Sequence, residues 1–356
     1  MTAWYQDDPM SALEAKEAAT RLAFAPIAFQ AALALRDLGL LAALGGAGDV
    51  GLDLEQIAER SGVSSYGCGV LLDMGLSARV VCQRDGSFRL TRMGQFLLHD
   101  GMTRANMDFT ADVCWRPLAH LSRAIRDGAP AGLAEFGPWP TIYPGLSQLP
   151  EAARRAWFAF DHYYSDRAFG ELLPRVFACK PRRIVDIGAN TARFALRCCS
   201  FDPQVHLTLV DLPPQLDVAM ANARAAGMDS RVTPHPADLL DPGQPLPSDG
   251  DVYWMSQFLD CFSPEQVVAI LRRVRAAMPD QATVCIVELF PDRQRFESAA
   301  YSLNATSLYF TCLANGNSRF YRCEDFLGLV RESGLQLVEQ VDRIGLGHSL
   351  LRLRPN

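Results

Sequence analysis

The sequence lacks features that define several large protein classes. Its 40 Asp and Glu outnumber its 34 Lys and Arg, so the net charge of −6 offers no general attraction for nucleic acid. No two of its ten cysteines have the CxxC spacing of a zinc finger. Most of these cysteines lie in apolar runs, which is typical of buried free thiols in a reducing compartment. We therefore expect no metal site and no nucleic-acid partner.

Targeting signals are also missing from the sequence. No stretch reaches the ~18 unbroken apolar residues that cross a bilayer. The acidic segment 1–10 has no apolar core and does not resemble a signal peptide. These observations predict a cytoplasmic protein with no membrane partner. At roughly 150 residues per domain, the chain of 356 residues is long enough for two domains.

The first hundred residues have the pattern of a helical domain that ends in a hairpin. Residues 22–44 are rich in Ala and Leu and predict one helix, with Pro26 tolerated in its first turn. Residues 52–76 predict two helices joined by a turn, the second with an apolar face of Val70, Leu71 and Met74. Residues 78–91 predict two short strands around an Asp-Gly turn. This order is the winged-helix pattern.

A winged helix serves either DNA binding or subunit association. A DNA reader needs Arg, Lys, Asn or Gln on its second helix to contact base edges. The predicted second helix, 64–75, has no Lys or Arg and contributes Asp73. We therefore interpret residues 1–102 as a domain that forms a homodimer, with DNA binding as the alternative.

The rest of the chain predicts a helical connector followed by an α/β domain. Residues 103–175 contain a Gly- and Pro-rich loop and, from Glu151, a long helix with aromatic residues on several faces. From residue 176 to 356, short apolar strands alternate with helices, which indicates an open, mostly parallel sheet. The last two strands flank a Gly-Leu-Gly turn and should pair as an antiparallel hairpin. The expected strands are RRIVDIG, HLTLVD, RVTPHPAD, DVYWMSQF, ATVCIVELF, LQLVEQVD and HSLLRLR.

Acidic residues follow five successive predicted strands. In open α/β sheets, ligands bind beyond the carboxyl ends of the strands, and buried acids are costly unless they have a task. We therefore expect the ligand site at this edge of the sheet. The five residues are Asp186, Asp211, Asp238, Asp260 and Glu288.

The loop after the first of these strands is poor in glycine. Gly188 is followed by Ala, Asn190, Thr and Ala, so the loop lacks the GxGxxG pattern that lets backbone approach a pyrophosphate. Asn190 can still adopt a left-handed conformation. Asp211 lies 25 residues after Asp186 and can accept hydrogen bonds from both hydroxyls of a ribose. These residues favour a nucleoside ligand without a pyrophosphate.

Two motifs carry a family resemblance. The segments VDIGANTARFA (185–195) and VDLP (210–213) resemble the first two cofactor motifs of class I S-adenosylmethionine (SAM) methyltransferases. The order of winged helix, helical connector and Rossmann-like domain resembles the small-molecule O-methyltransferases with an N-terminal dimerisation domain. That family includes plant caffeate-type enzymes and bacterial natural-product enzymes. The resemblance implies an α/β Rossmann-like catalytic domain, SAM as cofactor and S-adenosylhomocysteine (SAH) as product.

The resemblance also assigns cofactor roles to the strand-end residues. Asp186 and Gly188 are expected to line the methionine end of the cofactor, Asp211 to bind the ribose, and Asp238 with Leu239 to lie at the adenine. Asn190 and Leu212 are further cofactor-binding candidates. Ser256 and Gln257, in the segment MSQFLD, lie under the sulfonium and the acceptor. Helix capping or turn formation is the alternative role for Asp211 and Asp238, since DLLD-Pro is also favourable turn chemistry.

The chain departs from the family at the catalytic base. The family's His-Asp-Trp triplet falls on Asp260, Cys261 and Phe262, so an aspartate stands where the family has its histidine. Glu288 aligns with the acid that orients that histidine. Three mechanisms stay open. In the first, Asp260 is the base, with a pKa raised by burial; in the second, His162 is the base. In the third, no strong base is used, and proximity and desolvation are sufficient for methyl transfer.

Aromatic and amide side chains are expected to form the wall of an acceptor site, since such groups suit a flat hydroxylated ring. The expected function is methyl transfer from SAM to a hydroxyl of a small aromatic or polyketide-like natural product. The alternatives are C-methylation of a phenolic ring, and a SAM-fold binding or regulatory protein without methyl transfer. The expected wall residues are Trp115, Tyr163, Tyr164, Phe258, Phe262, Tyr309, Phe310 and Asn315.

Overall fold

The computed structural model describes residues 5–356, so the first four residues of the acidic N-terminal segment lie outside the described residues. The chain forms two compact units, one up to Ala111 and one from Asp112 to Asn356. The segment 112–175, expected to be a separate connector, is thereby grouped with the C-terminal sheet. The division into three functional parts at 102 and 175 stays a prediction.

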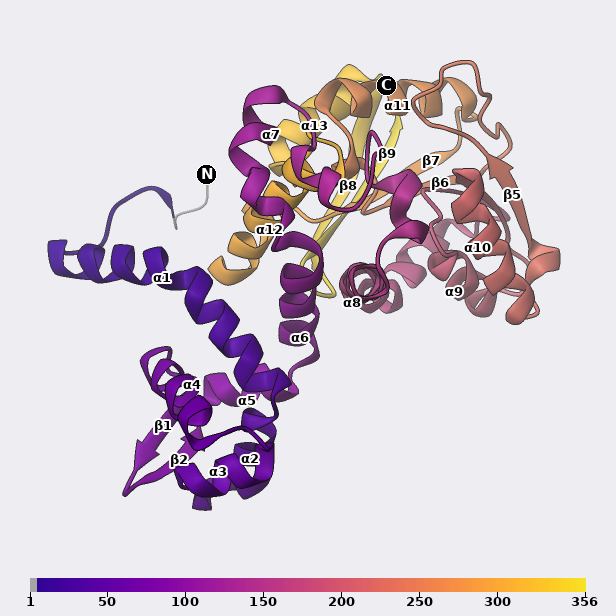
Figure 1. Ribbon diagram of the computed structural model, residues 1–356. Coiled ribbons are helices and arrows are strands. Elements are labelled where there is room, and N and C mark those ends of the chain that lie inside the picture. The colour runs from indigo at the N-terminus through magenta and orange to yellow at the C-terminus, as the bar shows by residue number, and fades with distance from the viewer. Residues whose placement is uncertain (1–4) are drawn as a thin grey trace. The chain divides into compact units, whose positions relative to one another are not determined.

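The first unit has the predicted helix, turn, helix and hairpin. The hairpin turns at Asp85 and Gly86, both at positive φ, as the Asp-Gly signal predicted. Asp53 caps α3 by accepting a hydrogen bond from the Gln56 backbone, and Ser64 caps α4 in the same way through Gly67. Its elements are α1 (Ala12–Asp37), α2 (Leu40–Ala47), α3 (Leu54–Ser61), α4 (Ser65–Ser77), β1 (Val81–Arg84), β2 (Ser87–Leu90), α5 (Arg92–His99) and α6 (Gly101–Asp108) (Figure 1).

The single helix predicted over 22–44 was wrong. Helix α1 begins earlier because Ser11 and Glu14 form a capping box, and it ends at Asp37. Gly39, at φ +82°, separates it from α2, since this left-handed conformation interrupts the helix at low cost for glycine. Pro26 therefore lies inside α1 and not in a first turn.

The predicted apolar face of the second helix was wrong at Val70, whereas Leu71 packs against the core of the first unit. Cys68, Leu72 and Gly75 of α4 are buried, whereas Val70 is 52% exposed. Three glycines and one cysteine in this helix weaken the contrast between its apolar and polar faces. The helix turns the i, i+4, i+7 row of small and apolar residues toward the core of the first unit.

Helix α1 carries exposed apolar side chains. By length and composition alone it is long and apolar enough to cross a membrane, and most of it is exposed. Leu22, Phe24 and Ile27 are 72%, 58% and 60% exposed. Exposed apolar side chains that gather on one element are typical of an interaction surface.

The second unit is built on a seven-stranded sheet in the order β5-β4-β3-β6-β7-β9-β8. The first five strands are parallel, and β9 pairs antiparallel with both β7 and β8, as predicted. Its strands are β3 (Arg183–Ile187), β4 (His206–Asp211), β5 (Val232–Pro236), β6 (Val252–Ser256), β7 (Thr283–Glu288), β8 (Leu335–Ile344) and β9 (His348–Pro355). Its α-helices are α7 (Leu121–Asp127), α8 (Glu151–Val176), α9 (Arg193–Phe201), α10 (Pro213–Ala225), α11 (Pro264–Ala277), α12 (Glu297–Tyr309) and α13 (Cys323–Glu332).

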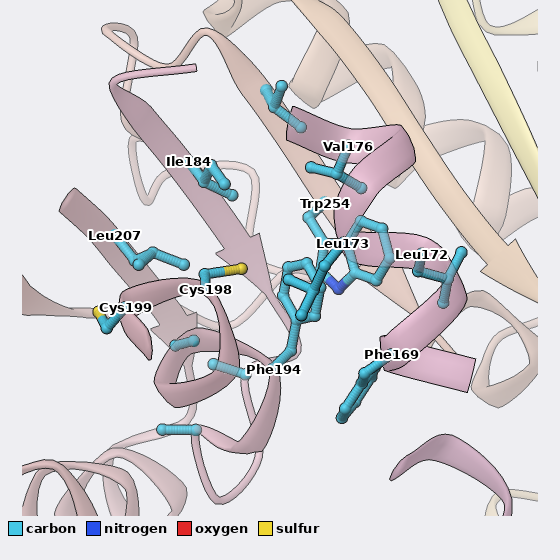
Figure 2. Packing of buried hydrophobic residues seen from close by; sticks show 14 of the residues in the cluster. Phe169, Leu172, Leu173, Val176, Ile184, Phe194, Cys198, Cys199, Leu207 and Trp254 are labelled. Carbon is cyan, nitrogen blue, oxygen red and sulfur yellow. The ribbon is translucent and has the colours of Figure 1, made fainter. Parts of the chain in front are cut away.

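Helices cover both faces of this sheet (Figure 1). Residues of α8, α9 and α10 form one buried cluster with the sheet, and residues of α11 and α13 form another on the opposite face. Figure 2 shows the first cluster, in which Phe194 of α9 stacks on Trp254 of β6 with ring centroids 3.9 Å apart. Because both faces are covered, the central strands β3, β6 and β7 are buried over most of their length, and acidic residues lie at or near their ends.

Strand order places the expected ligand site. The chain begins the parallel sheet at β3, adds β4 and β5 on one side, and then adds β6 and β7 on the other. The order therefore reverses between β3 and β6. Ligands of open α/β sheets bind beyond the carboxyl ends of the strands at such a point.

Candidate active site

The ends of β3 and β4 bring two buried acids together. Asp186 is the penultimate residue of β3, and Asp211 is the last residue of the adjacent parallel strand β4. Burial raises the pKa of Asp186 to about 8, and the charge of Asp211 adds to the rise. We call Asp186, Gly188, Asn190 and Asp211 the β3–β4 half of the site.

Asp211 holds the loop that follows β3. Its Oδ2 accepts a hydrogen bond from the Asn190 backbone at 2.8 Å, and its Oδ1 accepts one from the Leu212 backbone at 2.7 Å. Asn190 has the left-handed conformation that the sequence allowed, at φ +48°. Burial raises the pKa of Asp211, and these two backbone bonds oppose the rise. The carboxylate therefore joins two strand ends and keeps lone pairs for a ligand.

Gly188 gives this loop its tight path. Its φ is +77°, and its backbone N–H donates to the Val210 carbonyl at 2.9 Å. A Cβ at this position would overlap the ring of Phe258, which follows β6. One glycine is thus required here both for conformation and for close approach.

Asp186 has an unused hydrogen-bond acceptor. The residue is 3% exposed, and its Oδ2 has no hydrogen-bond partner among the described residues. A buried acceptor without a donor is rare in native proteins. A ligand with an ammonium group supplies such a donor. The β3–β4 half therefore fits the amino-acid end and the ribose of SAM, as the family resemblance implied.

Asp238 is engaged in a turn. Its Oδ1 accepts a hydrogen bond from the Leu240 backbone at 2.8 Å, and its carbonyl accepts one from Asp241 at 3.1 Å. The side chain is exposed. This geometry is the turn alternative that the sequence left open. A role at the adenine stays a prediction.

The other predicted cofactor residues lie at the same edge of the sheet. Leu212 precedes α10, Leu239 is 6% exposed, and Ser256 ends β6. Gln257 has φ +48°, and its side-chain oxygen is bonded to His348 Nε2 at 2.9 Å. Their contacts with the cofactor stay predictions.

Asp260 lies in a short 3₁₀ turn directly after β6. It is 4% exposed, and burial raises its pKa to about 7. The Cys261 thiol donates to its Oδ1 at 3.5 Å and opposes this rise, while the charge of Asp161 adds to it. A pKa raised toward neutrality suits a group that accepts and releases protons.

Glu288, the last residue of β7, holds this turn in place. Its Oε1 accepts hydrogen bonds from the backbones of Phe258 and Leu259 at 3.1 and 2.9 Å. Its Oε2 has no partner among residues 5–356, and the side chain is 2% exposed. Burial and the charge of Asp260 hold its pKa well above the usual value. Glu288 thus fixes the backbone that presents Asp260.

The sequence reasoning missed Asp161 of α8. Its Oδ2 accepts a hydrogen bond from the Asn190 side chain at 3.2 Å. Its negative charge contributes to the raised pKa of Asp260. Desolvation raises its pKa to about 7, although 25% of the side chain is accessible. A group that protein surrounds and solvent still reaches is typical of a site wall. Its spacing four residues after Trp157, on the same helix face, is the signal that could have found it.

Tyr143 and Trp157 were missed as well. The Tyr143 hydroxyl is buried beside Cys261 and has no nitrogen or oxygen partner among the described residues. The Trp157 ring nitrogen donates to the Tyr309 hydroxyl at 2.7 Å. Burial raises the pKa of the Tyr309 hydroxyl, and the nearby Cys261 and Asp161 add to the rise. Tyr143 lies in the Gly- and Pro-rich loop, where no periodicity marks a functional position.

These residues form the second part of the site. We call Asp161, Asp260, Glu288, Tyr143 and Tyr309 the β6–β7 half. They come from α8, the turn after β6, the end of β7, the loop before α8 and the end of α12.

The candidate histidine His162 and a second histidine near the site, His348, are both held in their neutral form. His162 Nε2 lies 3.3 Å from the Thr191 hydroxyl, and burial lowers the pKa of this histidine to about 4. It lines a surface recess of about 440 Å³ with Thr191, Arg193 and Asn222. His348 is fully buried, and burial lowers its pKa to about 4. An imidazole with so low a pKa is a weak proton acceptor near neutral pH.

The predicted acceptor wall is partly assembled. The rings of Phe258 and Phe262 lie 4.9 Å apart, and those of Tyr309 and Phe310 lie 5.3 Å apart. The Asn315 side chain donates to the Cys261 carbonyl. The predicted wall also includes Trp115, Tyr163 and Tyr164, whose contacts with an acceptor stay predictions. Trp115 is 39% exposed, and the ring centroids of Tyr163 and Tyr164 lie 5.9 Å apart.

The cysteines are free thiols in the part of the chain that the structure describes. Within residues 5–356, no three or more His, Cys, Asp or Glu are grouped to hold a metal ion.

Family comparisons match both units. Residues 169–336 match the family described as an O-methyltransferase domain, and residues 16–88 match a Dimerisation2-like domain. The two matches cover the strand-end acids and the winged-helix pattern respectively.

Individual relatives extend over most of the chain. The chain is 26% identical over 309 residues to 3-hydroxy-5-methyl-1-naphthoate 3-O-methyltransferase of Streptomyces sahachiroi, covering 86% of this chain and 85% of the relative. It is 22% identical over 275 residues to L-tyrosine C(3)-methyltransferase of Streptomyces lavendulae, covering 76% and 74%. The solved apo structure of the S-adenosylmethionine-dependent methyltransferase SibL superposes with a TM-score of 0.73 at 25% identity, covering 95% of this chain and 99% of that one.

The second unit carries an O-methyltransferase domain at residues 169–336, and most of the chain is similar to S-adenosylmethionine-dependent methyltransferases in sequence and in fold. This confirms the predicted fold class, family and cofactor.

Proposed function

We propose that this methyltransferase transfers the methyl group of SAM to a hydroxyl of a small aromatic or polyketide-like natural product, with Asp260 as the base. The naphthoate O-methyltransferase relative supports the acceptor class. The observation that carries the proposal is the burial of Asp260 at the end of β6, with its pKa raised to about 7. An ordinary aspartate is too acidic to take a phenolic proton efficiently, and burial reduces this mismatch.

Different residues bind the cofactor, accept the proton and position the base. SAM supplies an activated methyl group on a sulfonium. Asp211 and the loop through Asn190 hold the nucleoside, and the free oxygen of Asp186 accepts a hydrogen bond from the amino-acid end. Asp260 accepts the proton of the acceptor hydroxyl as the new bond forms. Glu288 fixes the turn that carries Asp260, which keeps this base in place.

C-methylation of a phenolic ring is the second candidate. The absence of the family's histidine favours it, and so does the relative that methylates a carbon of L-tyrosine. In that reaction a base that removes the hydroxyl proton makes the neighbouring ring carbon nucleophilic. Both candidates therefore use Asp260, and the position of the new methyl group separates them.

Product analysis tests the function. The purified protein is incubated with SAM and a panel of phenols, and mass spectrometry with fragmentation locates the added methyl on oxygen or carbon. We expect a methylated oxygen. Calorimetry with SAM and SAH is done in parallel. Absence of binding at millimolar ligand would contradict the enzyme assignment and leave a non-catalytic role. Activity unchanged by a chelator is expected for a reaction without metal.

We also infer a homodimer through the first unit, in the cytoplasm. The Dimerisation2-like match and the exposed apolar side chains of α1 support a second copy as the partner of this helix. Light scattering of the intact protein should give twice the chain mass. Ile27→Asp on α1 should yield monomers, whereas Val218→Asp at an exposed site on α10 should not. A monomeric unaltered protein would contradict the inference.

A further inference from the structure

The loop after β3 contains two non-glycine residues in the left-handed conformation. Asn190 has φ +48° and Ala192 has φ +64°. A Cβ makes this conformation unfavourable, more so for Ala than for Asn, and such residues persist where surrounding contacts hold them. The segment 188–192 has a single glycine, Gly188. Contacts from other elements are therefore needed to hold the loop in this shape.

Helix α8 contacts the segment 190–193, which completes this loop and begins α9. Asp161 Oδ2 accepts a hydrogen bond from the Asn190 side chain at 3.2 Å. The next residue of the helix, His162, has its Nε2 3.3 Å from the Thr191 hydroxyl. Two consecutive residues of α8 thus contact two consecutive residues of the loop.

The last residue of the segment forms an ion pair with the same helix. Arg193 Nε donates to both oxygens of Asp166 at 2.9 Å, and its Nη2 lies 2.6 Å from Oδ2 of that residue. A forked contact of this kind fixes direction as well as distance. The two side chains are 46% and 25% accessible, so solvent weakens the pair. We call Asp161 and Asp166 the α8 latch, since they bind the first and last residues of the segment.

Part of this segment borders a hollow instead of packed side chains. Thr191 and Arg193 line the surface recess of about 440 Å³, together with Asn222 of α10. The Asn222 side chain donates to the Thr191 carbonyl at 3.0 Å. Where close packing does not support a backbone, polar contacts such as these have to maintain its conformation.

The latch is connected to the cofactor residues through Asn190. The Asn190 backbone N–H donates to Oδ2 of Asp211 at 2.8 Å, while its side chain donates to Asp161. One residue therefore joins α8 to the carboxylate that we expect to bind the ribose. A change in the backbone conformation of Asn190 would move this N–H and release the Asp211 carboxylate.

We propose that the α8 latch positions the cofactor loop: Asp161 and Asp166 hold the segment 190–193 in the conformation in which Asn190 orients Asp211 for SAM. This inference rests on the proposed function, since it takes SAM as the ligand at this edge of the sheet. A loop with several glycines adopts left-handed conformations at low cost. In this chain, contacts from a neighbouring helix replace that freedom.

Binding of SAH to the full-length protein tests the latch. Asp161→Ala combined with Asp166→Ala removes both carboxylates and should weaken SAH affinity, measured by calorimetry, by about tenfold, because only a fraction of the released loops then has the binding conformation. The matched control combines Asp280→Ala with Glu332→Ala, which removes two surface carboxylates that are also paired with arginines. The control should stay within about twofold of the unaltered protein. A loss below about threefold in the latch variant, or an equal loss in the control, would overturn the proposal.

A single change on the loop side of the latch provides a second test. Arg193→Gln breaks the contact with Asp166 at a partly exposed position, and should weaken SAH affinity by about threefold even if the double variant fails to fold. In an Asp166→Ala background, Arg193→Gln should cause no further loss, because both changes break the same pair. Unchanged affinity in Arg193→Gln, or full additivity of the two losses, would contradict the proposal.

Hydrogen–deuterium exchange without ligand tests the loop itself. The peptide that contains Asn190 should exchange faster in the latch variant than in the unaltered protein, and at an unchanged rate in the control. Equal exchange in all three proteins would contradict the latch, whether or not SAH binds. Absence of SAH binding by the unaltered protein would instead contradict the proposed function.

Discussion

The two halves of the site are built in different ways. The β3–β4 half is held by backbone groups of one loop and two adjacent strands, with Asp211 accepting hydrogen bonds from two backbone N–H groups. The β6–β7 half consists of side chains from five separate segments, and two of them carry polar atoms without partners. A backbone-built site suits a constant ligand, the cofactor. A side-chain-built site can vary with the acceptor.

Burial acts on acids in both halves, with different consequences. Asp186 and Asp260 are almost equally buried, and burial raises their pKa values to about 8 and about 7. The Oδ2 atom of Asp186 has no hydrogen-bond partner among the described residues, so it can bind a ligand. Asp260 lies on a turn whose backbone is held by Glu288. One acid is therefore placed to bind and the other to exchange a proton.

Asp260→Asn should have the largest effect on turnover. Loss of a general base typically lowers kcat by about 10²- to 10⁴-fold, and SAH affinity should change by less than about threefold, because Asp260 lies in the other half. Asp260→His restores the residue type that the family resemblance places here and should retain more activity than Asn. Steady-state kinetics with calorimetry measures both. Turnover within about threefold of the unaltered enzyme would show that the halves are not divided in this way.

Asp211→Asn should have the next largest effect, on cofactor binding. Losing a charged acceptor in a buried network costs about 1.5–3 kcal/mol, or roughly 10- to 100-fold in SAH affinity. Asp238→Asn is the matched comparison, and should change affinity by less than about threefold because its carboxylate is exposed and holds a turn. Equal losses from both variants would show that the adenine end depends on Asp238 after all.

Gly188→Ala tests the packing of the β3–β4 half against Phe258, which follows β6. A Cβ at φ +77° is strained and overlaps the Phe258 ring, so the free energy of unfolding should fall by about 1–2 kcal/mol or more. Adding Phe258→Ala should remove the overlap and leave the strain, so the two changes together should cost less than their sum. Urea unfolding of the four proteins measures this. Simple additivity would contradict the contact.

The stability of the protein without ligand should depend modestly on pH. Asp161, Asp186 and Asp260 have pKa values raised to about 7, 8 and 7, above those of an unfolded chain. Their folded forms retain protons, so this stabilisation is complete below about pH 4 and is lost as the pH rises through about 8. The melting temperature should therefore fall by several degrees between about pH 5 and pH 8. Asp186→Asn should flatten this slope, and Asp238→Asn should not.

The same contrast explains what the sequence could predict. The strands, their order of appearance and their acidic ends follow from apolar runs bounded by polar residues, and HLTLVD coincides with β4. Asn190 and Asp211 belong to the two cofactor motifs that the sequence shows, so both residues could be predicted, whereas the hydrogen bond between them was found only in the structure. The errors in the first unit arose where glycine and small residues blur helical periodicity, as at Gly39 and in α4.

The β6–β7 half could be predicted only in part. Asp260 and Glu288 were found because they end strands. Asp161 was missed because it lies within a helix whose aromatic residues cover several faces, and Tyr143 was missed because it lies in a loop without periodicity. Their meeting depends on tertiary packing among distant segments. Residue spacing and periodicity within one segment do not predict contacts between distant segments.

The pH dependence of kcat/KM tests the central claim most directly, that a buried aspartate at the end of β6 takes the acceptor's proton. The base must be ionised, so kcat/KM should rise with pH through an apparent pKa of about 7, matching Asp260. The rise should disappear in Asp260→Asn. A profile that is flat from about pH 5 to pH 9, or an unchanged midpoint in Asp260→Asn, would contradict the account.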